Sequence, residues 1–333
     1  MYFLLGICLV FAFLLTLNLF ASISASVLWR VISRPAKNLS SRKLEQIIFA
    51  LRVFPVGAAL IFVLAFMLPA YILFEPHSTD EVVSLKLALI SLVSLLGIGI
   101  ASFRIFRTWL VTRRLAAEWL KHSQPIAVEE VNIPVYRMQH PFPVVAVVGM
   151  LRPRLFVAEQ IFTSLTPDEF RAAIAHEYGH LTAHDNFKRA FMRVCRDMLI
   201  FPFGRDLDRA WADNTEAAAD EYAAEVGGNS MALDLAEALI KVARIVPANT
   251  RPAMPLGSYV MGSNDGDLKR RIRRLLELAE KSSAVGKMSL LRSRQTVWLY
   301  PGLLFAAVVL LASNKTLLLA VHDISENVVA ILQ

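Results

Sequence analysis

The chain has 333 residues, of which 56% are hydrophobic and 19% charged, and its formal net charge at pH 7 is +7. Soluble domains carry about a quarter charged residues, so this composition argues against a water-soluble protein and favours an integral membrane protein. The chain contains two cysteines, Cys8 and Cys195. We therefore expect no disulfide framework.

Four stretches of the chain are apolar enough to cross a membrane. A helix needs about 20 apolar residues to span the hydrocarbon core of a bilayer. Transmembrane helices are predicted at about residues 2–29, 53–74, 87–106 and 296–314. A secretory signal peptide is the alternative for the first stretch, since small residues at 21–26 resemble a cleavage site. This stretch has no positively charged start and is longer than a typical signal core, which favours a membrane helix.

The charges of the connecting segments predict the orientation of these helices. Lysine and arginine accumulate on the cytoplasmic side of membrane proteins. Basic residues cluster after the first span (Arg30, Arg34, Lys37, Arg42, Lys43), after the third (Arg104, Arg107, Arg113, Arg114) and before the fourth (Lys287, Arg292, Arg294). The loop between the second and third spans is mainly acidic. We therefore expect a multi-pass protein of the cell inner (plasma) membrane with its N-terminus outside.

The domain organisation is predicted from these spans. Residues 1–111 form a membrane region with three transmembrane helices, and residues 112–295 form a cytoplasmic domain. The fourth span, 296–314, leads to a short extracytoplasmic tail, 315–333. Apolar residues recur in the tail at three- and four-residue spacing, which predicts an amphipathic helix on the outer membrane surface or against a partner protein. A continuation of the fourth span is the alternative for the first turn of the tail.

The cytoplasmic segment is predicted to be an α+β domain. Short runs rich in valine, isoleucine and phenylalanine at 133–138, 143–150 and 153–159 predict a small antiparallel sheet. The sequence TPDE at 166–169 contains a capping threonine, a proline at the first helical position and a glutamate three residues after the cap. This combination predicts the start of a helix. From Thr166 onward the pattern is helical.

The helix that starts at Thr166 carries the motif HEYGH. His176 and His180 are four residues apart and so lie on one face of the helix, with Glu177 beside them. Two imidazoles and a neighbouring carboxylate are what a zinc hydrolase needs. Solvated histidines on a surface helix are the alternative, but the apolar residues 172–175 before the motif indicate a buried helix.

A third histidine, His184, follows at the same spacing but is not expected to bind the metal. On a continuous helix it lies roughly 12 Å beyond His176, whereas metal–nitrogen bonds are about 2 Å long. The segment between His180 and His184 contains no glycine that would break the helix. We therefore expect His184 to be a polar residue that supports the site.

The third metal ligand is predicted in the segment 214–225. Glu216 and Asp220 are four residues apart on a helix face of small residues. Glu216 can complete a site of two histidines and one glutamate that leaves a position open for water. Asp220 can accept a hydrogen bond from the second nitrogen of a ligand imidazole and fix its tautomer. A solvated acidic face is the alternative, which the intact motif upstream disfavours.

Three segments of the chain together resemble the BlaR/MecR family of integral membrane zinc metallopeptidases. They are GMLRPRLFV (149–157), LTPDEFRAAIAHEYGHLTAHDN (165–186) and EAAAD (216–220). The pairing of HExxH with a downstream ExxxD is also similar to HtpX-type and CAAX prenyl proteases. The resemblance covers the topology and roughly residues 130–280, and it implies a zincin-like metalloprotease fold for the cytoplasmic domain.

The resemblance also implies roles for five residues. His176, His180 and Glu216 would bind Zn²⁺, Glu177 would be the catalytic base, and Asp220 would support a ligand. The fold class expected is thus an α-helical membrane protein with four transmembrane helices and a cytoplasmic α+β zincin-like metalloprotease domain. The group that stabilises the oxyanion is not singled out by any motif. His140, Tyr222 and Arg271 are the candidates.

The function implied is a membrane-embedded zinc endopeptidase that cleaves a cytoplasmic or membrane-proximal protein, such as a transcriptional repressor, in regulatory signalling. BlaR/MecR sensors carry a penicillin-binding domain after the last span, whereas only about 20 residues follow here, so antibiotic sensing is not expected. One alternative is an HtpX-like quality-control protease of membrane proteins. Another is a catalytically silent, zinc-binding signalling scaffold.

The expected partners are the lipid bilayer, a cytoplasmic protein substrate and a partner or sensor protein at the tail. A basic amphipathic helix is predicted at 268–281, and near a membrane such a helix favours anionic lipid. No nucleic-acid recognition motif accompanies it, so no nucleic acid is expected as a partner.

Overall fold

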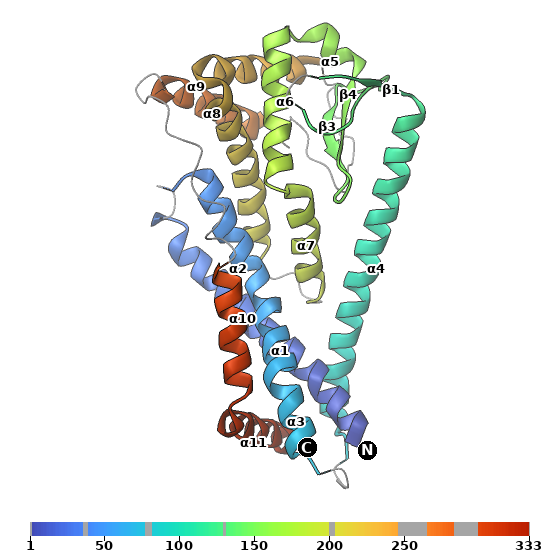
Figure 1. Cartoon of the computed structure of the whole chain (residues 1–333), viewed down its shortest axis with the longest axis vertical. Helices are drawn as coiled ribbons and strands as arrows, with labels where there is room; N and C mark the ends of the chain where they lie inside the picture. Colours follow the sequence, from blue (N-terminus) through green and yellow to red (C-terminus); the bar gives the residue numbers. More distant parts are fainter. Residues whose placement is uncertain are drawn as a thin grey trace.

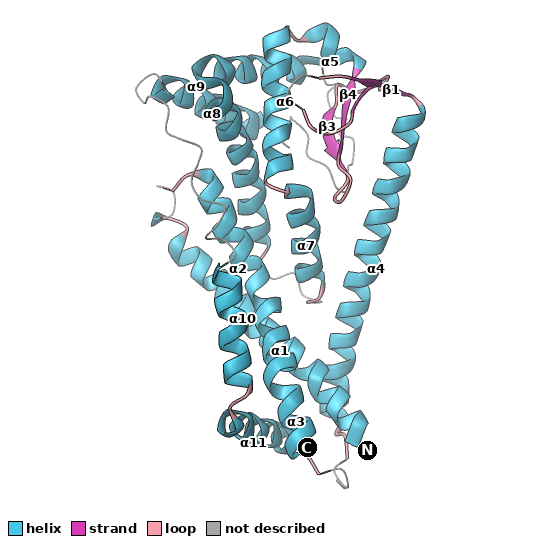
Figure 2. Cartoon of the chain, viewed as in Figure 1, coloured by secondary structure: helices cyan, strands magenta, loops and turns pink. Residues whose placement is uncertain are grey.

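The computed structural model of the chain describes residues 2–35, 39–76, 82–128, 131–199, 204–245, 265–282 and 299–332. Two parts follow each other along the long axis in Figure 1. One end is a bundle of apolar helices, and the other is a small sheet with helices beside it, which we call the α+β domain. Figure 2 shows that the described chain is mostly helical and that its strands lie in the α+β domain.

Three helical segments are long and apolar enough to cross a membrane. They are α1 (Tyr2–Ile32), the continuous rod of α2 (Ser41–Phe62), the π-helical turn η2 (Val63–Met67) and α3 (Leu68–Phe74), and α4 (Leu85–Lys121). Large apolar side chains such as Phe3, Phe54 and Phe103 are exposed on these helices. Such a surface fits contact with lipid, so the helices indicate a membrane-spanning protein that includes the first three predicted spans.

The predicted fourth span differs from a single straight helix. Helix α10 (Leu299–Ala312) begins at the first residue that the structure describes in this part of the chain. The described part qualifies as a candidate span only together with α11 (Lys315–Leu332), from which it is bent by 74°. The bend lies at Asn314, whose side chain accepts a hydrogen bond from the Leu317 amide at 3.2 Å and so starts a new helix. The described residues thus contain three candidate spans, or four if the bent pair counts as one.

Some predicted features lie outside the described residues. These are residues 296–298 of the fourth span, residues 77–81 of the acidic loop, and the basic residues Lys37, Lys287, Arg292 and Arg294.

The sheet is mixed and has four strands, so the prediction of a small antiparallel sheet is wrong. Its strand order is β1 (Ser123–Ile126), β2 (Val135–Met138), β4 (Arg154–Ala158) and β3 (Val145–Val148). Strands β2 and β4 are parallel, and the other two pairs are antiparallel.

The mixed pairing has a simple cause in the β3–β4 turn. Gly149 adopts φ 107°, and a Cβ atom there would lie 2.8 Å from the carbonyl oxygen of Arg152, so this tight reversal requires glycine. The reversal makes β4 antiparallel to β3. Strand β2 runs opposite to β3, so β4 is parallel to β2 where the two strands pair. Strand β1 was not predicted because its sequence, SQPI, is polar and contains a proline. Proline is tolerated in β1 because this strand lies at the edge of the sheet.

The rest of the α+β domain is helical. Helices α5 (Glu159–Ser164), α6 (Pro167–Thr182), α7 (Asp185–Asp197), α8 (Arg205–Ile245) and α9 (Asp265–Ser282) follow the sheet in chain order. The predicted helix start at Thr166 is confirmed, since Thr166 and Glu169 form a reciprocal capping box. The residues just before the HEYGH motif, Ala172 and Ala173, are buried in the core with the sheet. Helix α6 is therefore a core helix, as the sequence indicated.

Helix α6 ends two residues before His184, and the prediction of one helix through all three histidines is wrong. His184 adopts a left-handed conformation with φ 56° and precedes α7. Among non-glycine residues, histidine is one of those that tolerate this region. The chain therefore turns without glycine, and His184 is exposed on the turn.

The α+β domain is packed onto the membrane helices. Trp29, Leu44 and Ile48 of α1 and α2 share one buried apolar cluster with Met192 of α7 and with Leu207 and Trp211 of α8. Helix α4 continues without a break from the membrane region to β1, so the predicted boundary at residue 111 falls inside one helix. A packed interface and a continuous helix connect the two parts.

Candidate active site

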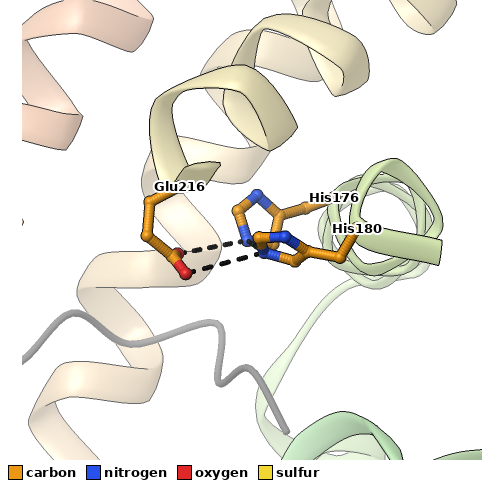
Figure 3. A group of neighbouring side chains, drawn as sticks. All are labelled: His176, His180 and Glu216. Atoms are coloured by element: carbon orange, nitrogen blue, oxygen red, sulfur yellow. Dashed lines mark hydrogen bonds and ion pairs between the residues drawn. The ribbon is translucent and has the colours of Figure 1, made fainter. Parts of the chain in front are cut away.

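Three side chains from two helices converge inside the α+β domain (Figure 3). His176 and His180 project from α6, and Glu216 projects toward them from α8. The Nε2 atoms of the two histidines are 3.2 Å apart; that of His176 lies 3.6 Å from Oε2 of Glu216, and that of His180 lies 3.6 Å from Oε1. Both histidines are buried. The three predicted ligand residues thus lie together in the structure.

The spacing of these atoms fits a zinc ion. Ligand atoms about 2.1 Å from a tetrahedral zinc ion lie about 3.4 Å from one another. The observed separations of 3.2 and 3.6 Å lie on either side of this value. Burial acts to raise the pKa of Glu216, but His180, His176 and Arg271 lower it to about 2, so the carboxylate is ionised as metal binding requires. Two imidazoles and one carboxylate form a donor set that zinc accepts.

The close approach of α6 and α8 depends on Gly179. A Cβ atom at Gly179 would lie 3.1 Å from the Cα atom of Ala219 and 3.3 Å from the Cβ atom of Tyr222. Both distances are shorter than an ordinary van der Waals contact, so the absence of a side chain lets the helices pack this closely. The small residues of the EAAAD segment face the HEYGH motif for the same reason, and Glu216 reaches the histidines.

Asp220 connects His176 to a third helix. Its Oδ1 atom lies 3.0 Å from Nδ1 of His176, and Arg271 of α9 donates to both of its carboxylate oxygens, at 2.7 and 2.9 Å. Arg271 also places Nη1 3.2 Å from Oε2 of Glu216. Burial alone would lower the pKa of Arg271, but Asp220 and Glu216 raise it. Arg271 therefore offsets the negative charge of the buried Asp220 and the half-buried Glu216.

Arg271 is buried, whereas the basic residues of the amphipathic helix predicted at 268–281 were expected to face anionic lipid. Arg271 lies on the buried face of α9 with Leu275 and Ala279, four and eight residues further along. The spacing of Arg271 with these two apolar residues is the signal in the sequence that would have placed it in the interior.

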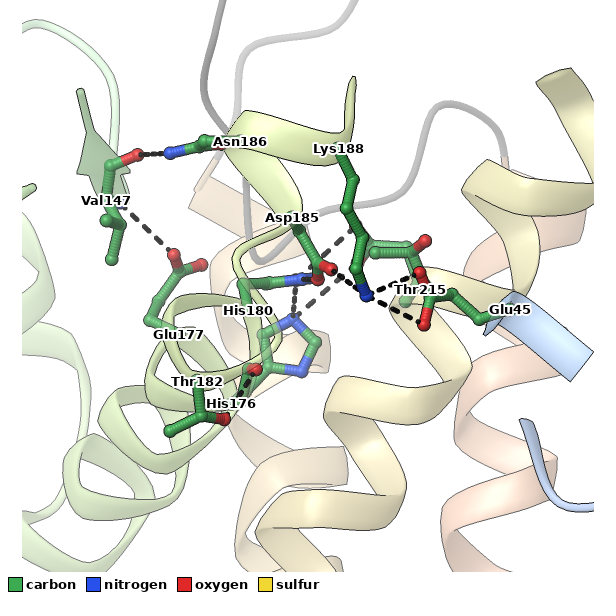
Figure 4. A network of polar contacts seen from close by, with 12 residues as sticks. Glu45, Val147, His176, Glu177, His180, Thr182, Asp185, Asn186, Lys188 and Thr215 are labelled. Carbon is green, nitrogen blue, oxygen red and sulfur yellow. Dashed lines mark hydrogen bonds and ion pairs between the residues drawn. The ribbon is translucent and has the colours of Figure 1, made fainter. Parts of the chain in front are cut away.

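Asp185 makes a second contact that the sequence did not predict. Its Oδ2 atom lies 2.7 Å from Nδ1 of His180, at the start of α7. Figure 4 shows how the contact continues into the membrane region: Lys188 lies 3.9 Å from Asp185 and donates to Glu45 of α2 at 2.9 Å. Trp211 also donates to Glu45, at 2.9 Å. A buried polar network therefore joins His180 to a membrane-spanning helix. In the sequence, Asp185 directly follows the third histidine, His184, and this acidic residue could have indicated a partner for a ligand histidine.

Glu177 lies between the two histidines in sequence and contacts the edge of the sheet. Its Oε2 atom accepts a hydrogen bond from the Val147 amide at 3.2 Å (Figure 4), and its Oε1 atom is buried without a hydrogen-bond partner among the described residues. Burial raises the pKa of Glu177 to about 8, with Glu216 adding to the rise and His180 opposing it. A carboxylate with a pKa near neutrality and a free oxygen suits proton transfer to and from a water molecule.

Among the described residues, His184, His140 and Tyr222 make no hydrogen bond or ion pair with the three-residue group. His184 is exposed. The Nδ1 atom of His140 lies 3.2 Å from the carbonyl oxygen of Phe142, and its ring packs against Trp119. The ring of Tyr222 lies 6.4 Å from that of Tyr178. Of the three oxyanion candidates, Arg271 is the one that contacts the group in the described part of the chain.

The fold indicates a membrane-spanning protein, and the site has the donor set of an HExxH metallopeptidase. Residues 127–207 match the sequence model of peptidase family M48. This match includes the HEYGH motif, ends before Glu216 and covers less than half of the chain. It supports a metallopeptidase of the M48 family, whose members are zinc enzymes, and it does not support the BlaR/MecR subtype in particular. No curated protein matches the chain at a significant level.

Proposed function

We propose that the protein is a membrane-embedded zinc endopeptidase with His176, His180 and Glu216 as the zinc ligands. One observation carries this proposal: the Nε2 atoms of both histidines and the carboxylate oxygens of Glu216 are 3.2–3.6 Å apart, close to the ligand separations of a tetrahedral zinc site. Beside them lies a buried oxygen of Glu177 that has no hydrogen-bond partner among the described residues. A zinc ion bound there supplies Lewis acidity and lowers the pKa of water toward neutrality.

The protein side chains would divide the remaining work. Glu177 accepts a proton from the attacking water and later transfers it to the leaving amine, because its Oε1 atom has no competing partner in the part of the chain that the structure describes. Asp220 and Asp185 each hold one imidazole in a fixed orientation and tautomer. Arg271 keeps the charge of the carboxylates balanced and is the best-placed candidate to stabilise negative charge that develops on the substrate.

Strand β3 supplies a site where an extended substrate can bind. The Ala158 amide donates to the Val144 carbonyl, and bonded pairs alternate along an antiparallel ladder, so Ala146 also faces β4. The backbone groups of Val145 and Val147 therefore point to the free edge. Glu177 and Asn186 already bond to Val147 there, which leaves Val145 to pair with a peptide.

The proposed substrate is a cytoplasmic or membrane-proximal protein, cleaved in a regulatory pathway. The basic segments after the first and third spans support a cytoplasmic position for the α+β domain. The buried network from Glu45 to His180 supports regulation, because it connects a membrane-spanning helix to the site. A partner protein at the C-terminal tail would deliver the signal.

The proposal is tested with purified protein and a Glu177→Gln variant. The variant should keep stoichiometric zinc, since Glu177 is not a ligand, and lose about two to four orders of magnitude in cleavage of a fluorogenic peptide, because an amide cannot accept the proton. Glu277→Gln, the same exchange at an exposed position of α9, should leave cleavage unchanged. Undiminished turnover in Glu177→Gln would refute the assignment.

The protein fragments that accumulate in cells distinguish regulatory cleavage from quality control and from a silent scaffold. Comparison of proteins from cells with the wild type and with Glu177→Gln should show one or a few cytoplasmic regulatory proteins that are cleaved only by the wild type. Fragments from many membrane proteins would support quality control instead. A zinc-loaded wild type that cleaves no peptide, not even denatured casein, would support a silent scaffold.

A further inference from the structure

A second group of metal-ligating side chains lies at the end of the helix bundle that is opposite the α+β domain. Glu75 directly follows α3, and His322 and Glu326 project from α11. One ligand atom from each of the three lies within 4.8 Å of the other two. Helices α3 and α11 adjoin each other at this end in Figure 1. The group therefore connects residues that are about 250 positions apart in the sequence.

The three side chains present a coherent set of donors. His322 and Glu326 are four residues apart and so lie one turn from each other on the same face of α11. Two carboxylates this close to each other repel when both are ionised. A divalent cation between them removes that repulsion and uses the imidazole as a third ligand. One nitrogen and two carboxylate ligands suit a cation of intermediate softness such as Zn²⁺.

The surroundings of the group favour a specific site over a loose patch of surface charge. Glu75 is only 5% exposed, and His322 and Glu326 are half-buried. The ring of Phe74 lies 6.0 Å from that of His322, and buried Leu318 and Val321 belong to the apolar cluster at this end. An apolar environment limits competition from water and strengthens electrostatic attraction to a cation.

One atom of the group has an unused capacity for bonding. The Nδ1 atom of His322 is buried and has no hydrogen-bond partner in the part of the chain that the structure describes. A buried polar atom without a partner costs free energy, and it is rare in folded proteins. This observation is independent of the clustering of the three residues, and a cation bound at Nδ1 would satisfy this atom.

We propose that Glu75, His322 and Glu326 bind a divalent cation of the Zn²⁺ type, distinct from the one in the active site. The cation would tie the C-terminal helix α11 to the end of α3. Because α2, η2 and α3 form one continuous rod, this second site lies at one end of the rod and Glu45 near the other. This inference does not depend on the proposed peptidase activity.

The test uses the full-length protein in detergent micelles, with Zn²⁺ alone as the probe. The wild type should bind two Zn²⁺ ions per chain, and His322→Ala with Glu326→Gln should bind one. Asp323→Asn, an exposed residue next to His322, is the matched control and should still bind two. Equal stoichiometry in the double variant and the wild type would overturn the proposal.

A second background separates the two sites. In the double variant that carries His176→Ala and His180→Ala, the active site lacks two ligands. One Zn²⁺ should remain bound at the second site, with the same affinity as in the wild type. Adding His322→Ala should then weaken this binding at least tenfold. Hydrogen exchange of α11 gives a further readout, because Zn²⁺ should slow exchange in α11 when His322 is present. Protection of α11 that is equal with and without His322 would also contradict the proposal.

Discussion

The Nδ1 atom of His180 lies 2.7 Å from Oδ2 of Asp185, although the two residues belong to different helices. The turn at His184 brings Asp185 back toward the end of α6, and Asp185 is buried there. A carboxylate bonded to a ligand imidazole fixes its tautomer and raises its basicity. Each proposed histidine ligand thus has its own acidic partner, Asp220 for His176 and Asp185 for His180.

Replacing Asp185 by Asn should lower the zinc affinity by about 10–100-fold, the usual effect of losing such a partner. The amide has nearly the same shape, so the fold should be retained. Competition with a chelator of known affinity measures the change. Asp206→Asn, at an exposed position of α8, is the control and should have no effect. Wild-type affinity in Asp185→Asn would show that the contact does not support the metal.

His184→Ala should retain stoichiometric zinc, whereas Glu216→Ala should lose most of it. His184 is exposed on the turn after α6, while Glu216 lies 3.6 Å from both histidines. Metal analysis after dialysis against a weak chelator distinguishes the two variants. A greater loss in His184→Ala than in Glu216→Ala would mean that the ligand set is wrong.

Gly179→Ala should push α6 and α8 apart and weaken zinc binding. The new Cβ atom would lie 3.1 Å from the backbone of Ala219, which cannot rotate away as a side chain can. Overpacking of this kind costs about 1–3 kcal/mol of unfolding free energy. Thermal unfolding with and without zinc should show a lower midpoint and a smaller stabilisation by the metal. Gly266→Ala, where a Cβ atom meets nothing within 4 Å, should change neither.

Val145→Pro should impair peptide cleavage more than zinc binding. The Val145 amide points to the free edge of the sheet, so proline removes a donor that the substrate would use without breaking the pairing with β4. Loss of one hydrogen bond of about 1 kcal/mol lowers kcat/KM about fivefold. Ala146→Pro removes a donor to β4 and should reduce zinc binding and cleavage together. If both variants lose zinc and cleavage equally, the edge is not a substrate site.

Cysteine labelling should place the two ends of the molecule on opposite sides of the membrane. An impermeant maleimide should label Val82→Cys on whole cells, and Ser230→Cys only after permeabilisation, because the basic residues predict a cytoplasmic α+β domain. The parent protein should give little background. Cys8 and Cys195 are buried, and burial raises the pKa of the Cys195 thiol to about 11, which suppresses the reactive thiolate. The reverse labelling pattern would invert the topology.

Local features of the sequence were sufficient for the three long apolar helices, the start of α6 and the choice of HEYGH and EAAAD as the motifs that carry the candidate ligands. Each depends on residues close together in the chain: a run of apolar side chains, a capping box at Thr166, or two ligands one helical turn apart. The three residues His176, His180 and Glu216 could be chosen because zinc chemistry restricts both the type and the spacing of its ligands.

Other features depend on contacts between distant segments, and only the tertiary structure decided them. Strand β4 pairs with β2 as well as with β3, and hydrophobic patterning indicates which faces of the strands are buried but not which strands pair. Asp185 reaches His180 only because His184 adopts a left-handed conformation. Arg271 and Glu45 come from helices 95 residues after and 131 residues before His176, and their charges are buried only because Asp220 and Lys188 meet them there. A buried charge requires a partner, and the partner is determined by the packing of the helices.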